Sequence, residues 1–377
     1  MNGKRKVLFL VTEDQYFCSH YLPHASAAKR QGFDVLVVTR VRNHGRQIEE
    51  EGFRLIPIEM SRAGINPLME LGTLWKLIRI YKDEKPDVVH HIAMKPVLYG
   101  SFVAWITRVP FRVNLFGGLG YMFTSRRWRA VFLRKFVSNA FRILLNRPNS
   151  RVIFQNPDNQ SVMIRLGILK PGSTRLIRGV GVNPEVFLPT PEPVGITTVV
   201  LAARMLWDKG VGEFVEAARR IRDKGIDARF ILVGDTDPEN PAAVPPYQLA
   251  AWNSSGVVEW WGRREDMPNV FAQAHVVCLP SYYGEGVPRV LIEAAASGRP
   301  IVTTDAPGCR EIVRHGENGL LVPVRDAVDL ASALEKLIAD PALRRKMGAN
   351  GRSLAVSEFS VEKITRQTLA LYQELAG

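Results

Sequence analysis

The sequence predicts an α/β protein built from two doubly wound parallel-sheet domains that face each other across a cleft. Strand-type apolar runs alternate with helix-type segments in the first half of the chain, and the same alternation starts again at Thr197. A polar, proline-rich break over residues 188–195 separates the two halves. With 377 residues, 46% of them hydrophobic, the chain can bury two cores of ordinary size. We therefore expect a first domain over residues 1–187, a linker over 188–196 and a second domain over 197–360.

The strands expected in the first domain are short runs of apolar and β-branched residues. They lie at residues 6–12, 33–39, 54–58, 88–90 and 113–115. Residues 361–376, at the end of the chain, have the pattern of a helix. This order of elements is typical of a doubly wound sheet.

Two glutamates eight positions apart follow a buried strand-type run over residues 275–280. Glu285 is expected in the loop after that strand, and Glu293 on the next helix, about one and a half turns from its start. Ligands of open α/β sheets bind outside the carboxyl ends of the strands, where both carboxylates can accept hydrogen bonds from sugar or ribose hydroxyls. The alternative is that the two glutamates are solvated or cap the helix.

The loop and helix start between these glutamates have the features of a phosphate site. Glycines let backbone amides approach a ligand closely, and a proline suits the first turn of a helix whose free N–H groups favour an anion. The residues expected to contact the ligand in this way are Gly284, Gly286, Val287 and Pro288.

A second strand, loop and helix carries two cations. Arg204 follows a strand-type run, and Lys209 precedes Gly210 at the start of an amphipathic helix. The two side chains can converge on a diphosphate near the N-terminus of that helix. Taken alone, the spacing is also compatible with solvated cations near a loop.

Together, Arg204…Lys209-Gly210 and Glu285-Gly-x6-Glu293 resemble the donor half of the family 4 glycosyltransferases, retaining enzymes of the two-domain GT-B fold. The resemblance extends over most of the chain through motifs at residues 87–91, 117–123, 154–156, 177–187, 231–234 and 318–323. Within the family, the chain is most similar to the bacterial transferases that extend an undecaprenyl-diphosphate-linked sugar. The segments behind this narrower statement are residues 61–67, 118–120, 204–214 and 280–288.

The resemblance implies a UDP-sugar donor and a role for each donor-side residue. Arg204 and Lys209 would stabilise the negative charge that grows on the leaving diphosphate. Glu285 would bind the hydroxyls of the donor sugar, and Glu293 the ribose of the nucleotide. No side-chain nucleophile is implied, and the leaving phosphate oxygen would accept the proton of the acceptor hydroxyl.

The resemblance also bears on metals and on the end of the chain. Neither a cofactor nor an essential metal is expected, because cations and helix dipoles replace a metal at the diphosphate in such enzymes. Asp235-Thr-Asp237 resembles a metal-binding D-x-D sequence, but two aspartates are too few ligands to fix a metal. The helix expected at residues 361–376 would cross back to cover the first domain.

The expected activity is the transfer of a sugar, an N-acetylhexosamine or a hexose, to an undecaprenyl-diphosphate-linked saccharide. Such a step would belong to the assembly of O-antigen, capsule, exopolysaccharide or a glycoprotein glycan. Two alternatives stay open: a GT-B epimerase acting on a UDP-sugar, and a non-catalytic protein that binds nucleotide sugar or lipid.

The acceptor side, in the first domain, has weaker signals. Many family members have a Gly-Gly loop after the first strand, but residues 12–23 contain no glycine. Candidates for acceptor contacts follow other strand ends or precede the first helix: His20, His90, His91, Lys95, Gly117, Gly118 and Gly120. For His20, a contact to the donor is an equal alternative. The alternatives are that a histidine packs or caps, and that the glycines only form a tight turn.

A net charge of +13 points to an anionic partner or surface. Residues 125–147 combine seven cations with large apolar side chains at helical spacing, which is typical of a helix in a membrane interface. The alternative is an ordinary helix with a core stripe and a solvated face. No nucleic-acid recognition motif is present. The residues expected at an anionic membrane surface are Arg126, Arg127, Trp128, Arg129, Phe132, Arg134, Lys135 and Phe136.

The cysteines and the first residues bear on location. Cys18, Cys278 and Cys309 are widely spaced and indicate a reducing compartment. The first apolar run is too short for a signal-peptide core or a membrane span. We expect a cytoplasmic protein that associates peripherally with the cytoplasmic membrane.

Overall fold

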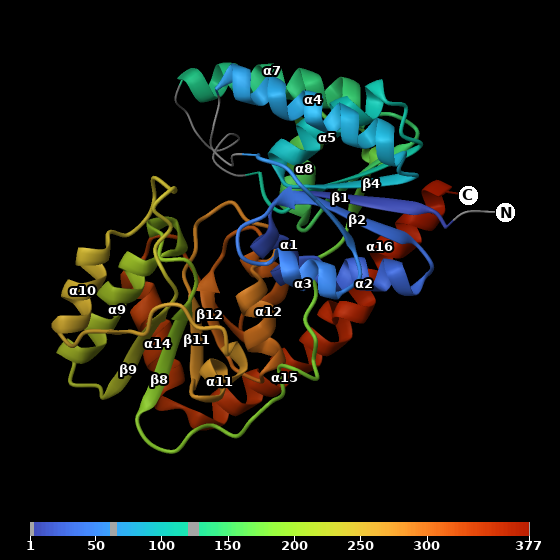
Figure 1. The fold of residues 1–377 in the computed structure, drawn as a ribbon. Coiled ribbons are helices and arrows are strands. Elements are labelled where there is room, and N and C mark those ends of the chain that lie inside the picture. The colour runs from blue at the N-terminus through green and yellow to red at the C-terminus, as the bar shows by residue number, and fades with distance from the viewer. Residues whose placement is uncertain (1–3, 61–65, 120–127, 377) are drawn as a thin grey trace. The chain divides into compact units, whose positions relative to one another are not determined.

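The computed structural model describes residues 4–60, 66–119 and 128–376. The chain divides into two compact units, and the first includes both the blue-to-green part of the ribbon and the red C-terminal helix in Figure 1. The first unit consists of Met1–Val180 with Glu362–Gly377, and the second of Gly181–Val361. Each unit is built around its own parallel sheet, so the α/β fold class is confirmed.

Within the described part of the first unit, seven parallel strands form one sheet in the order β3-β2-β1-β4-β5-β6-β7. The strands are β1 (Lys6–Glu13), β2 (Asp34–Arg40), β3 (Arg54–Pro57), β4 (Val88–Ile92), β5 (Phe111–Phe116), β6 (Ser150–Phe154) and β7 (Thr174–Leu176). The helical segments are α1 (Asp14–His20), α2 (Leu22–Arg30), α3 (Gly45–Glu50), α4 (Pro67–Glu84), α5 (Met94–Ile106), α7 (Trp128–Leu145), α8 (Pro157–Arg165), η1 (Pro171–Ser173) and α16 (Val361–Ala376).

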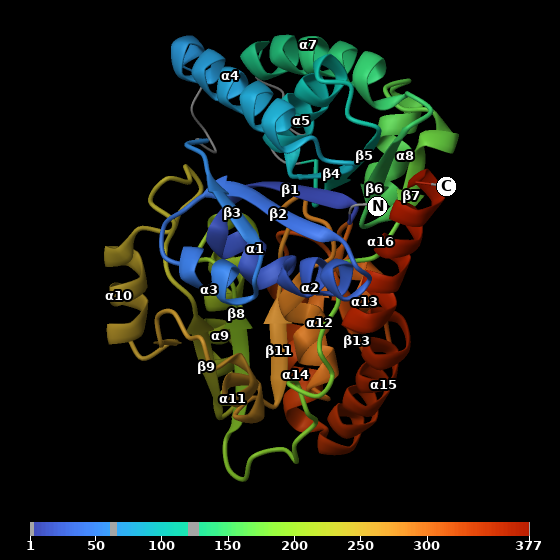
Figure 2. The same ribbon diagram turned by 45° about the vertical axis from the view of Figure 1, so that its right-hand side comes forward.

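Helices cover both faces of this sheet because successive strand residues point to opposite faces. Phe9 of β1 packs in a cluster with α2 and with Tyr372 of α16. Leu8 and Leu10, its neighbours, pack on the other face with Tyr81 of α4 and with α5. Figures 1 and 2 show α1, α2, α3 and α16 on one face and α4, α5 and α7 on the other.

Within the second unit, six parallel strands have the order β10-β9-β8-β11-β12-β13. They are β8 (Thr197–Ala202), β9 (Ala228–Val233), β10 (Glu259–Trp260), β11 (Val276–Leu279), β12 (Ile301–Thr304) and β13 (Gly319–Val322). The helical segments are η2 (Trp207–Lys209), α9 (Val211–Asp223), α10 (Pro246–Ser254), α11 (Met267–Ala272), α12 (Arg289–Ala296), α13 (Cys309–Ile312), α14 (Ala327–Ala339) and α15 (Pro341–Phe359).

The strand order reverses once in each sheet. In the first unit β1 lies between β2 and β4, and in the second β8 lies between β9 and β11. Loops on the two sides of such a point leave in opposite directions, so a crevice forms outside the carboxyl ends of these strands. This position is where each unit can bind a ligand.

The unit boundary differs from the one expected at residue 187, because residues 181–187 belong to the second unit. The backbone N–H of Val182 donates to the carbonyl of Phe359, and the N–H of Val361 donates to the carbonyl of Val182. Gly181 permits this approach, since a Cβ there would lie 2.7 Å from Cα of Val361. The two passages of the chain between units are therefore adjacent.

The proline-rich segment expected as a linker is anchored on the second unit. The guanidinium of Arg299, 2% exposed, donates to Oγ1 of Thr190 at 2.5 Å. Arg344, 4% exposed, forms a two-point ion pair with Glu192, with both distances at 3.0 Å. A proline-rich composition can thus mark an ordered surface strap as well as a free linker.

Candidate active site

The donor-side residues lie on two loops at the carboxyl ends of β8 and β11. The loop after β8 carries Arg204 and Lys209, and the loop after β11 carries Glu285. The two strands are paired neighbours in the sheet, so both loops leave the same edge. Residues that are about eighty positions apart in the sequence meet here.

Lys209 and Glu285 form an ion pair at this edge. Nζ of Lys209 lies 2.5 Å from Oε2 of Glu285, and the two side chains are only 11% and 14% exposed. The other carboxylate oxygen, Oε1, accepts a hydrogen bond of 2.8 Å from Oγ of Ser281. The cation expected at a diphosphate and the carboxylate expected at a sugar are therefore direct neighbours.

Gly210 allows the two loops to pack closely. Its φ of 76° is in the left-handed region that favours glycine, and a Cβ there would collide with the carbonyl of Pro280. Gly308, in the loop after β12, packs in the same way against the carbonyl of Gly286. Three successive loops of the edge are held together by these backbone contacts.

Arg204 pairs with an aspartate of the D-x-D sequence. Its Nη1 lies 2.6 Å from Oδ2 of Asp237, and its side chain is 41% exposed whereas that of Asp237 is 15% exposed. The backbone N–H of Met205 also donates to the carbonyl of Asp235. Asp237 is thus the partner of a cation, and no cluster of three or more metal-binding side chains occurs in the part of the chain that the structure describes.

Glu293 lies on α12 and is 6% exposed. Its Oε1 lies 2.7 Å from Nε of Arg289, one turn earlier. Burial raises the pKa of Glu293, and the charge and hydrogen bond of Arg289 partly offset that rise. The carboxylate expected at the ribose is therefore already paired with a cation of its own helix.

The loop between the two glutamates offers mainly backbone groups. Val287 is 6% exposed, and its side chain packs in the core against residues of α12. Pro288 is the residue before the first turn of α12, with an extended backbone, rather than a residue of that turn. Gly284 is half-buried and Gly286 is buried. These four positions can contact a ligand chiefly through their main chain.

His90 and His91 do not reach the surface, which corrects the expectation that they contact an acceptor. Both are fully buried. Nδ1 of His90 lies 2.6 Å from the hydroxyl of Tyr372. His91 lies within hydrogen-bond distance of the Tyr81 hydroxyl at 3.0 Å and of Asn114 at 2.7 Å. The reason is that β4 continues to Ile92, so both histidines lie inside the strand rather than beyond its end.

Lys95, the next acceptor candidate, is also engaged within the first unit. Its Nζ lies 2.6 Å from Oε1 of Glu70 on α4, and each side chain is 16% exposed. Nζ also lies 5.5 Å from the centre of the Tyr99 ring. Lys95 therefore connects α5 to α4, a structural position that the sequence pattern did not indicate.

His20 and Gly117 both lie beside Tyr16, at the carboxyl edge of the first sheet. The rings of Tyr16 and His20 are 4.4 Å apart. The hydroxyl of Tyr16 lies 3.2 Å from where a Cβ of Gly117 would stand. Gly118 follows Gly117 after β5, and Gly120 lies outside the described residues. His20, Gly117 and Gly118 thus remain candidates for acceptor contacts at this edge, and the phenol of Tyr16 lies beside them.

Asp14 is a buried aspartate in the segment after β1, where many family members have a Gly-Gly loop. Oδ2 of Asp14 accepts hydrogen bonds from the backbone N–H groups of Arg42, Asn43 and His44, at 2.7–3.0 Å. Burial alone would raise the pKa of Asp14, but the backbone hydrogen bonds outweigh it and lower the pKa. The ionised carboxylate thus fixes the loop after β2 against the start of α1.

Comparison with known proteins shows which family has this arrangement. Residues 6–156 match the family described as glycosyl transferase 4-like, and residues 196–340 match that described as glycosyl transferases group 1. The chain is 30% identical over 371 residues to N,N'-diacetylbacillosaminyl-diphospho-undecaprenol alpha-1,3-N-acetylgalactosaminyltransferase of Campylobacter jejuni, covering 94% of each protein. The chain belongs to the group 1 glycosyltransferases. The family expected from the donor motifs is thereby confirmed.

One further sequence relative and one solved structure are similar to this glycosyltransferase. It is 24% identical to UDP-Gal:alpha-D-GlcNAc-diphosphoundecaprenol alpha-1,3-galactosyltransferase of Escherichia coli, over 91% of this chain and 89% of the relative. Its fold matches that of Anabaena HepE, solved in complex with UDP, with a TM-score of 0.78 and 21% identity over 98% and 100% of the two chains. The two-domain GT-B fold is therefore confirmed.

Sequence reasoning did not predict three side-chain contacts at the carboxyl edges of the two sheets. Ser281 touches Glu285, Asp237 touches Arg204, and Tyr16 lies against His20. Ser281 and Asp237 each come a few residues from a predicted position, at the end of a strand-type run. A search for polar residues next to the motifs could have found these two, but the pairings depend on loop geometry.

The basic segment of the glycosyltransferase, residues 125–147, contains the whole of α7. Arg126 and Arg127 lie outside the described residues, and Trp128, Arg129 and Phe132 fall in the first turns of α7, before its described side chains begin. Arg134 is half-buried, Lys135 is exposed and Phe136 is 69% exposed. Over the described ranges, no helix has the length and apolar character needed to span a membrane.

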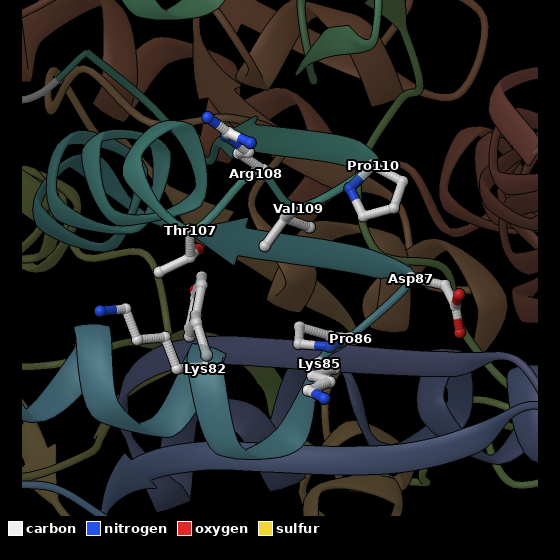
Figure 3. Close-up of a pocket in the computed structure, with 9 residues that line it drawn as sticks. Lys82, Lys85, Pro86, Asp87, Thr107, Arg108, Val109 and Pro110 are labelled. Carbon is white, nitrogen blue, oxygen red and sulfur yellow. The ribbon is translucent and has the colours of Figure 1, made fainter.

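A cavity of about 370 Å³ lies at the opposite edge of the first sheet. Its lining comes from the segments just before β4 and just before β5, which are the amino ends of these strands. Figure 3 shows that Lys82, Lys85 and Arg108 point away from one another rather than toward a common centre. Because no predicted site residue lines this cavity, we do not assign it to the reaction.

Proposed function

We propose that this glycosyltransferase transfers a sugar from a UDP-sugar to an undecaprenyl-diphosphate-linked saccharide, with retention at the transferred carbon. The second unit would bind the donor and the first unit the acceptor. The relatives from Campylobacter jejuni and Escherichia coli have names that specify a diphosphoundecaprenol acceptor, and the second name also specifies a UDP-sugar. The observation that carries the proposal is the group of Lys209, Ser281 and Glu285 at the carboxyl edge of β8 and β11.

The donor diphosphate would bind the two cations of this edge. Lys209 is held beside the N-terminus of α9, whose free N–H groups also favour an anion. Arg204 is the more exposed of the two and can reach a ligand by leaving Asp237. As the bond from the sugar to the diphosphate breaks, negative charge grows on the leaving oxygen, and both cations stabilise it.

The sugar would be recognised by Glu285, and the ribose by Glu293. An ionised carboxylate accepts about four hydrogen bonds, so Glu285 can bind sugar hydroxyls while it keeps its contacts to Lys209 and Ser281. Glu293 is fixed by Arg289 and would accept from a ribose hydroxyl with its carboxylate already oriented. Both roles follow the resemblance stated for these positions.

The reaction would need no side-chain nucleophile. The acceptor hydroxyl oxygen forms the new bond to the sugar carbon on the same face from which UDP leaves. Its proton passes to the departing phosphate oxygen, so the products are the extended saccharide and UDP. Because Arg204, Lys209 and the start of α9 supply positive charge, we also propose that no metal is required.

The acceptor would approach the edge formed by Tyr16, His20 and Gly117, the last next to Gly118. Gly120 stays a candidate from the sequence. His90, His91 and Lys95 would act there only by holding β4 and α5 in place. The aromatic ring of Tyr16, packed on His20, gives a surface against which a sugar can stack.

We further propose that the first unit binds an anionic membrane, as a lipid-linked acceptor requires. On α7, Lys135 and the 69% exposed Phe136 face solvent. On α4, Leu68, Met69, Leu71 and Trp75 are 62–81% exposed, and cations follow at Lys76, Arg79 and Lys82. Both helices pack on α5, on the same face of the sheet (Figure 2). Exposed apolar residues with cations beside them match the interface of an anionic bilayer.

The test is to incubate the purified enzyme with a panel of UDP-sugars and an undecaprenyl-diphosphate-linked saccharide, and to follow UDP release and product mass. The proposal predicts release that needs one donor and the lipid together, a matching mass increment, and unchanged rates in EDTA. NMR of the product should show the anomeric configuration of the donor. Donor conversion without lipid would instead indicate an epimerase, and donor binding without any turnover would indicate a binding protein.

A further inference from the structure

Ser281 is a buried polar residue beside the donor site for which the sequence motifs assign no role. It follows β11 and Pro280, and its side chain is 0% exposed. We propose that Ser281 is a positioning residue that orients the carboxylate of Glu285 for recognition of the donor sugar. This inference rests on the proposed function, since it specifies how that donor site is set up.

The hydrogen bonds around Oγ of Ser281 determine its direction as a donor. A hydroxyl has one hydrogen to donate and two lone pairs to accept. The backbone N–H of Tyr283 donates to Oγ at 3.3 Å. Oγ lies 2.8 Å from Oε1 of Glu285 and 3.3 Å from the carbonyl oxygen of Asp208. The shorter distance and the charge of the carboxylate direct the hydrogen toward Glu285.

The backbone of Ser281 is itself held from two sides. Its carbonyl accepts a hydrogen bond from Oγ1 of Thr304, at the end of β12. The next residue, Tyr282, donates its N–H to the carbonyl of Asp208 at 3.0 Å, in the loop that carries Lys209. Ser281 therefore presents a fixed donor from the sheet edge to a carboxylate on a loop.

The two oxygens of Glu285 have different kinds of partner. Oε2 contacts Lys209, a cation that the donor diphosphate would attract, whereas Oε1 contacts Ser281, a neutral and buried donor. When Lys209 shares its charge between Glu285 and the diphosphate, the hydrogen bond from Ser281 still holds Oε1 in place. The orientation of Glu285 therefore does not depend on Lys209 alone.

The test compares the affinities of Ser281→Ala and the wild type for UDP and for the intact UDP-sugar, by calorimetry. A hydrogen bond to a charged group is worth about 1.5–3 kcal/mol, so we expect UDP-sugar affinity and kcat/KM to fall about tenfold to hundredfold. UDP affinity should change less than about threefold, because UDP lacks the sugar that Glu285 contacts. In a Glu285→Gln background, the same serine change should have little further effect.

A matched control is available in Ser297→Ala. Ser297 is also a buried serine of the second unit, 3% exposed, and its Oγ has no hydrogen-bond partner within the described structure. We expect this variant to bind both ligands like the wild type. Ser281→Thr, which keeps the hydroxyl, should restore UDP-sugar affinity if it folds with the wild-type melting temperature.

Equal UDP-sugar affinity in Ser281→Ala and the wild type would overturn the positioning role while leaving the proposed function intact. A parallel loss of UDP and UDP-sugar affinity would also overturn it, since that pattern belongs to a general disturbance of the loop. If the wild type binds no UDP-sugar at all, the proposed donor is wrong, which is a separate outcome.

Discussion

The two units of this glycosyltransferase present their candidate residues in opposite ways. In the second unit, Lys209 and Glu285 lie on loops beyond the ends of their strands and contact each other. In the first unit, His90 and His91 lie within β4 and are completely enclosed. The comparison teaches that a polar residue near a strand end becomes a site residue only when the strand has already ended. When the strand extends one or two residues further, as β4 does, the same residue is buried in the core.

The largest expected effect concerns the donor residues of the second unit. Arg204→Ala should lower kcat about 10²-fold to 10³-fold, because it removes one of two cations at the leaving diphosphate. The melting temperature should stay near that of the wild type, since Arg204 is 41% exposed. The matched control is Arg219→Ala, which removes a similarly exposed arginine of α9. Full activity in a folded Arg204→Ala enzyme would exclude this role.

Removing a buried histidine of the first unit should affect stability instead of catalysis. His91→Ala deletes a ring that packs on Gly100 and bonds to Asn114. We expect a loss of about 2–4 kcal/mol in the free energy of unfolding, measured by denaturant titration. The acceptor KM of the folded enzyme should be nearly unchanged. A large rise in that KM without a loss of stability would mean that His91 does contact the acceptor.

The exposed face of α4 provides a test that concerns the first unit alone. Trp75→Glu should weaken binding to vesicles containing anionic lipid about tenfold, because it places a charge where an aromatic ring would enter the interface. Tyr247→Glu is the control, since Tyr247 is 74% exposed on α10 of the second unit. Co-sedimentation with vesicles measures both. Equal losses in the two variants would argue against a docking face on α4.

The buried histidines should also make the enzyme less stable in acid. Burial lowers the pKa of His24 and of His91 to about 4, and that of His90 well below its ordinary value. Their stabilising contribution is present above the unfolded-state pKa of about 6.5. It is lost as the pH falls from there toward the folded-state value, because the unfolded chain then binds more protons.

Between pH 7 and pH 5.5, each such histidine should reduce the free energy of unfolding by about 1 kcal/mol. Denaturant titrations at the two pH values measure the sum. In His91→Asn, the loss of unfolding free energy between these pH values should be smaller by about 1 kcal/mol, the contribution of one histidine. Stability that does not change across this range would contradict the neutral, enclosed state of these rings.

Much of the fold, and the donor half of the candidate site, could be predicted because their signals are local. Alternating apolar runs mark the strands, and the donor motifs place Arg204, Lys209 and Glu285 in the loops that follow two of them. What was missed depends on contacts between distant segments. Arg299 and Arg344 anchor the proline-rich segment, expected to be a free linker, from more than one hundred residues away.

The apolar face of α4 was missed for a related reason. Leucines and a tryptophan at helical spacing predict a core-facing stripe, and only the structure shows that Leu71 and Trp75 are exposed. In the same way, the pattern around His90 cannot show whether a strand stops before or after it. Ser281 lies within the motif at residues 280–288, but its proposed role depends on the direction of a single hydroxyl.

The central claim is that the second unit alone recognises the nucleotide, and UDP binding to two variants tests it most directly. Calorimetry should show that Lys209→Ala weakens UDP binding at least tenfold, because it removes one of the two cations proposed to bind the diphosphate. His20→Ala should leave UDP affinity unchanged and raise only the KM of the lipid-linked acceptor. A loss of UDP affinity in His20→Ala, with wild-type affinity in Lys209→Ala, would contradict the account.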